Sequence, residues 1–170
     1  MGDTLMLTEG QRTRLWESWL AAEMRALYFA ELSYRYRRRQ QFTTWGVLCL
    51  SSGATLALIG RLPEPWAWLP PGLTFLTAAL SVYLTVAQNQ KQAIDAADLH
   101  AGWAAAGADY ERLWETGMYA EDAAVTLNAI GDRTAALSRV GTGFPANRRR
   151  LLKWQDHVER QHHVGAHANA

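Results

Sequence analysis

Four histidines late in the sequence come closest, by residue type and spacing, to a reactive site: His157, His162, His163 and His167. His163 and His167 are four residues apart, so on a helix they would share one face and could bind the same metal ion. The residues that follow are alanines and one asparagine, so no further ligand is held rigidly beside this pair. We therefore predict that the chain has no metal site.

No other group of residues assembles into a catalytic site. His100 has no nucleophile or paired base among its neighbours, which favours a structural role. Gly141 and Gly143 lack the third glycine of a dinucleotide-binding fingerprint and follow no strand pattern. Cys49 is the single cysteine, which excludes an internal disulfide and a cysteine-based zinc site. We predict no catalytic residue, no cofactor and no enzyme activity.

The charged residues are distributed very unevenly along the chain. Between Arg39 and Lys91, only Arg61 and Glu64 are charged. Two uncharged runs in this region, at about 42–60 and 69–87, are each long enough as helices to cross the ~30 Å hydrocarbon core of a bilayer. The sequence therefore predicts a transmembrane hairpin, and the alternative is a pair of core helices in a soluble bundle.

Charges beside the hairpin predict its orientation. An arginine cluster directly precedes the first span, and Lys91 follows the second, which places both termini in the cytoplasm. The alternative for the cluster is a nucleic-acid or nucleotide patch, but a net charge of +1 gives no support for nucleic-acid binding. We interpret the cluster as a topology signal that contacts lipid headgroups: Arg35, Arg37, Arg38 and Arg39.

The segments outside the hairpin are also expected to be helical, so the fold class is all-α. We divide the chain into an N-terminal cytoplasmic helix (1–41), the hairpin (42–90) and a cytoplasmic helical region (91–170). Thr8 and Gln11 fit a capping box at the start of the first helix, which should continue into the first span. Later helices are expected at about 88–119, 121–139 and 146–163.

One helix of the last region carries an apolar row that requires a partner helix. Its members repeat at spacings of four and three residues, the pattern of a coiled-coil seam. The alternative is that the row packs only within its own chain, against the antiparallel helix expected at 121–139. We interpret this row as the contact between subunits of a homo-oligomer: Leu99, Trp103, Ala106, Tyr110 and Leu113.

Small and hydroxyl residues form rows along the two spans. On the first span, small residues that permit close helix packing fall on one face: Gly46, Gly53, Ala57 and Gly60. On the second, a polar row is expected to line a water-filled pore: Thr74, Thr77, Ser81, Thr85 and Gln88. This requires one unbroken helix from Pro71 to about Tyr119. The alternative is that these hydroxyls bond to carbonyls of their own helix and assist packing.

The layout resembles a known family. A tyrosine- and arginine-rich helix end (residues 26–39, ALYFAELSYRYRRR) leads into two spans joined by a short Pro/Trp loop, and a helical tail with AGADYERLW (residues 106–114) follows. This is similar to the SLATT group of bacterial two-span proteins associated with nucleotide-second-messenger and other phage-defence systems, over roughly residues 15–115.

The resemblance implies an oligomeric, pore-forming or membrane-disrupting effector in an abortive-infection system. Its partners would be other copies of itself, the lipid bilayer, and a sensor protein or nucleotide signal. The alternative function is a membrane-anchored adaptor whose cytoplasmic helices recruit a soluble partner.

Overall fold

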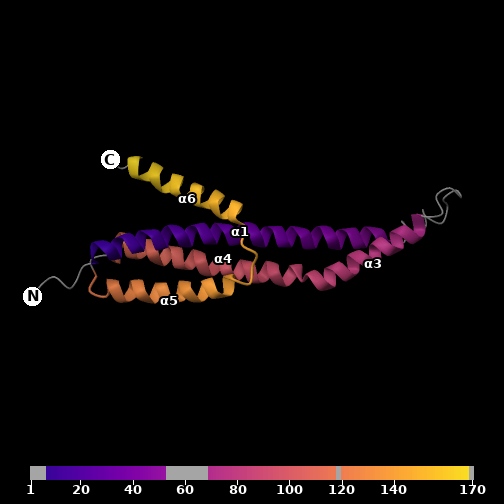
Figure 1. The fold of residues 1–170 in the computed structure, drawn as a ribbon, viewed down its shortest axis with the longest axis horizontal. Coiled ribbons are helices and arrows are strands. Elements are labelled where there is room, and N and C mark those ends of the chain that lie inside the picture. The colour runs from indigo at the N-terminus through magenta and orange to yellow at the C-terminus, as the bar shows by residue number, and fades with distance from the viewer. Residues whose placement is uncertain (1–6, 53–68, 118–119, 169–170) are drawn as a thin grey trace, which may run out of the picture. The chain divides into compact units, whose positions relative to one another are not determined.

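The computed structural model describes residues 7–52, 69–117 and 120–168, and every element in these ranges is helical. In chain order the helices are α1 (Glu9–Ser51), α3 (Leu69–Ala87), α4 (Asn89–Arg112), the π-helical turn η2 (Leu113–Gly117), α5 (Ala123–Gly141) and α6 (Arg148–Ala168) (Figure 1). The predicted all-α class is confirmed.

Helix α1 begins with the predicted capping box. The backbone N–H of Thr8 donates to the Gln11 side-chain oxygen at 2.8 Å, and the N–H of Gln11 donates back to the Thr8 hydroxyl at 3.3 Å. These two bonds satisfy N–H groups that a helix start otherwise leaves without partners. The helix then runs without a break past Phe42 to Ser51, as predicted.

The chain separates into two compact units, and the predicted division at 41 and 90 stays a prediction. One unit is Met1–Glu31 with Ala96–Ala170, and the other is Leu32–Asp95. Helices α1 and α4 each contribute to both. We call the described part of the first unit the helical bundle. We call the described part of the second unit the apolar unit.

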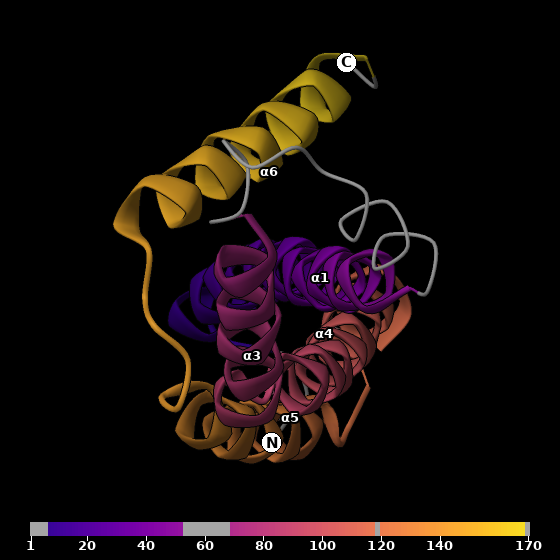
Figure 2. The same cartoon turned by 90° about the vertical axis from the view of Figure 1, so that its right-hand side faces the viewer.

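Four helices run in alternating directions in the helical bundle. Trp16 on α1 meets Trp114 at the far end of the α4 segment, with ring centroids 5.3 Å apart, so α1 and α4 are antiparallel. Helix α5 packs antiparallel on α4, and Figure 2 shows α4 between α1 and α5 in this unit. Helix α6 returns along α1, because Trp154 bonds to Glu31 and the later His162 bonds to Glu23.

Helices α4 and α5 approach closely at a glycine. A Cβ atom at Gly102 would lie only 2.7 Å from Leu137 Cδ2, so the Leu137 side chain would have to shift to accommodate it. The loop predicted from Gly141 to Pro145 does separate α5 from α6. Tyr28 on α1 fixes this loop by donating its hydroxyl to the Pro145 carbonyl at 2.9 Å.

The apolar row of α4 forms the core of the bundle. Its five residues are 0–5 % exposed: Leu99, Trp103, Ala106, Tyr110 and Leu113. The other buried side chains of this unit include Leu15 and Trp19 of α1 and Leu127 and Ile130 of α5. The partner helices that the row requires therefore belong to the same chain. The contact of this row with a second copy of the chain stays a prediction.

A helix from Pro71 to about Tyr119 would be interrupted at one position. Gln88 has a φ angle of 44°, in the left-handed region, and it separates α3 from α4. Because a helix needs a negative φ at every residue, side chains before and after Gln88 do not keep one common face. The polar row of α3 is thus not continued in register into the apolar row of α4.

Candidate functional site

Helix α3 is the candidate membrane helix of the apolar unit. Its bounds, Leu69–Ala87, coincide with the predicted second span. Among the residues that the structure describes, one helical stretch, Pro71–Gly117, is long and apolar enough to cross a membrane, and none of its most apolar window is buried. Phe75 is 77 % exposed and Val86 is 74 % exposed. Such a surface is suited to contact with lipid or with another apolar surface.

The hydroxyl row of α3 is bonded to its own helix. Thr77 donates to the Leu73 carbonyl at 2.8 Å, and Ser81 donates to the Thr77 carbonyl at 2.8 Å. Thr85 repeats this pattern one turn later at 3.1 Å. These are the bonds expected when hydroxyls satisfy themselves within a membrane helix. The row does not need water, although Thr74, Ser81 and Thr85 are exposed in the single chain.

The first predicted span is described only as far as Ser52. Gly46 lies against α3, where an added Cβ would be 3.8 Å from Leu80 Cδ1, an ordinary contact. The other small residues of its row, Gly53, Ala57 and Gly60, lie outside the described residues. Upstream on α1, an exposed arginine cluster precedes the span: Arg35, Arg37, Arg38 and Arg39. The Arg38 guanidinium lies over the Phe42 ring, 5.2 Å from its centre.

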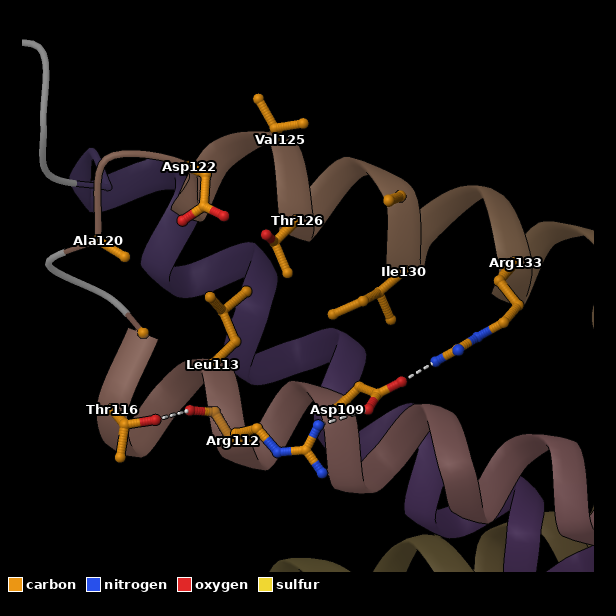
Figure 3. A pocket seen from close by; sticks show the side chains of 12 residues that line it. Asp109, Arg112, Leu113, Thr116, Ala120, Asp122, Val125, Thr126, Ile130 and Arg133 are labelled. Atoms are coloured by element: carbon orange, nitrogen blue, oxygen red, sulfur yellow. Dashed lines mark hydrogen bonds and ion pairs between the residues drawn. The ribbon is translucent and has the colours of Figure 1, made fainter.

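The bundle contains a pocket of about 500 Å³ between the end of α4, η2 and the start of α5. Leu113 and Ile130 point into it from opposite helices, as Figure 3 shows. Asp109 forms ion pairs with both Arg112 and Arg133. Two guanidinium groups therefore share one carboxylate beside this pocket, and exposed pairs of this kind contribute about 0–1 kcal/mol each.

A second pocket of the bundle, of about 410 Å³, is bordered by α1, α4, α5 and the loop before α6. We call it the Arg25 pocket. Its walls are largely aromatic, and Phe29 and Phe144 meet edge to face with centroids 5.7 Å apart. Gly141 lies close to this wall, and a Cβ there would be 3.3 Å from Phe29 Cζ, so the ring would have to move slightly. Leu151 of α6 also borders the pocket, which is thus built from segments that are distant in sequence.

Arg25 is the charged group of this pocket. Its guanidinium donates to the Ser138 hydroxyl at 3.0 Å and lies over the Trp103 ring, 4.6 Å from the centre. Burial lowers the pKa of Arg25 below its ordinary value, and the Tyr110 phenol opposes this. The side chain nevertheless stays charged at neutral pH. No carboxylate of the described residues forms an ion pair with it.

The described histidines have structural partners. His162 bonds to the Glu23 carboxylate at 2.6 Å and packs edge-on against Trp16 and Trp19. The His100 ring nitrogen Nδ1 is 2.9 Å from the Ala26 carbonyl oxygen. Of His163 and His167, only the helical backbone is described. The described part of the chain holds no cluster of three potential metal ligands.

Sequence reasoning missed Arg25 as a functional candidate. The residue lies inside a helix with no neighbouring motif, and its pocket partners, Trp103 and Ser138, are 78 and 113 positions away. An arginine on the apolar side of a helix was the one available signal. Comparisons of the chain with protein-family models, with curated proteins and with solved structures found no match.

Proposed function

We propose that this chain is a membrane-anchored adaptor of the bacterial plasma membrane. Two spans hold it in the bilayer with both termini in the cytoplasm, and the helical bundle binds a soluble partner or signal there. The observation that carries this proposal is the contrast between the two units. The bundle has a buried core of large apolar residues, such as Trp103 and Leu113, whereas α3 leaves residues such as Phe75, Val82 and Val86 uncovered.

Three further features support an adaptor. The hydroxyls of α3 are satisfied within their own helix, so they do not require a water-filled conduit. The apolar row of α4 is covered by its own chain, so its five residues are buried without a second subunit. The bundle also carries pockets open to solvent, which a binding module needs and a simple anchor does not.

A second candidate is the pore-forming effector of a phage-defence system, which the resemblance to the SLATT group suggests. One observation favours it: none of the most apolar part of α3 is buried in the single chain, so other copies could pack on it. Two helices cannot enclose water, so this function requires a ring of several subunits.

Membrane potential separates the two candidates. The protein is induced in a bacterium while a potential-sensitive dye is followed, with an ionophore as the positive control. An adaptor leaves the potential unchanged. Rapid depolarisation that is altered by Thr77→Val and Ser81→Ala, and unaffected by Ala79→Val on another face of α3, would instead establish the pore and refute the adaptor.

A further inference from the structure

We infer that the Arg25 pocket is a binding site for a small aromatic carboxylate. The first argument is charge. Arg25 contributes a half-buried guanidinium, whose neighbours in the described structure are the Ser138 hydroxyl and the Trp103 ring. None of the residues that line the pocket is acidic. A cation in such a place is stabilised when an anion binds beside it, since burial penalises an uncompensated charge.

The second argument is the shape and chemistry of the walls. The rings of Tyr28, Phe29, Trp103 and Phe144 line a space of about 410 Å³, within the range of small-molecule sites. Tyr28 is held in place by its bond to Pro145, and Phe29 packs edge-on with both Tyr28 and Phe144. Walls fixed in this way favour a flat apolar body, because stacked and edge-to-face ring contacts are both available.

The third argument limits the charge of the ligand to one. Arg25 is the single cationic side chain among the lining residues. A carboxylate carries one negative charge and matches the planar fork of a guanidinium, whereas a phosphate monoester carries close to two. A flat ring that bears one carboxylate fits all of these features.

The role of such a ligand rests on the proposed function, in which the bundle receives a signal for the membrane-anchored chain. Binding itself does not depend on that function. It is therefore measured on the full chain in detergent micelles, by calorimetric titration with empty micelles as the blank. The probes are 2-naphthoate and its neutral isostere 2-naphthamide, which differ in charge and hardly in shape. Adenosine monophosphate serves as the doubly charged comparison.

Three variants assign the site. Arg25→Met removes the guanidinium and keeps an apolar stem, while Arg139→Met is the matched control, because Arg139 is exposed near the end of α5. Ala146→Trp places a large side chain at an exposed position of the pocket wall without touching Arg25. Thermal unfolding of each variant checks that it is folded. If Arg25→Met does not fold, Ala146→Trp still tests whether the probes bind in this pocket.

We expect naphthoate to bind about 10- to 100-fold more tightly than naphthamide, the range for a hydrogen bond to a charged group. Arg25→Met should bring that ratio close to one, Arg139→Met should preserve it, and Ala146→Trp should weaken both probes. Equal affinities in the unmodified protein, or a ratio that survives Arg25→Met, would overturn the inference. Tighter binding of adenosine monophosphate would overturn the single-charge assignment. Absence of naphthoate binding would refute the site, while the membrane-potential test would still decide the proposed function.

Discussion

Truncation of Leu99 distinguishes a core within one chain from a seam between chains. Leu99 lies on α4 and is 3 % exposed, with the other members of its row equally buried. Leu99→Ala should lower the free energy of unfolding by about 2–5 kcal/mol, the range for a buried leucine truncated in a packed core. Leu152→Ala on α6 is the matched control. Because Leu152 is 48 % exposed, this substitution should change the free energy of unfolding by only about 0.5 kcal/mol.

The assay is urea unfolding of the full chain in detergent, followed by near-ultraviolet circular dichroism at two protein concentrations about a hundredfold apart. If the row is internal, Leu99→Ala lowers the free energy of unfolding by the same amount at both concentrations. If the row joins subunits, dilution by a hundredfold lowers the apparent stability by about 2.7 kcal/mol. A midpoint that depends strongly on concentration in the unmodified protein, and not in Leu99→Ala, would refute the intrachain core.

Two local predictions concern the loop before α6 and the break between α3 and α4. Tyr28→Phe should cost about 1 kcal/mol in thermal unfolding, because the Pro145 carbonyl loses its donor, whereas Tyr34→Phe at a 63 % exposed position should cost nothing measurable. Gln88→Gly should stabilise the protein by about 1 kcal/mol, since glycine adopts a φ of 44° without strain, and Gln92→Gly inside α4 should destabilise it by a similar amount. If both variants of a pair change the stability equally, the result would contradict the hydrogen bond of Tyr28 or the backbone conformation of Gln88.

Local sequence signals predicted the elements well. The apolar run that begins at Leu69 and ends at Ala87 is bounded by prolines and by polar residues, and α3 has these bounds. The capping box at Thr8 likewise marks the start of α1. These features are encoded by neighbouring residues, so they need no knowledge of tertiary contacts.

Features that depend on tertiary contacts were predicted poorly. The row from Leu99 to Leu113 showed that a partner helix was needed, but its spacing is the same whether that partner belongs to the chain or to a second copy. No glycine or proline lies at or next to Gln88, so the sequence does not predict the break there. The Arg25 pocket forms only when residues far apart in sequence meet, so no local spacing could indicate it.

The most direct test of the central claim measures on which side of the membrane each part of the chain lies. A reporter enzyme that is active only in the periplasm is fused after Glu64, between the two predicted spans, or to either end of the chain. The fusion after Glu64 should be active and both terminal fusions inactive, because the arginine cluster before the first span and Lys91 after the second remain inside. Activity at a terminus, or inactivity after Glu64 in a stably expressed fusion, would contradict a membrane-anchored chain with a cytoplasmic bundle.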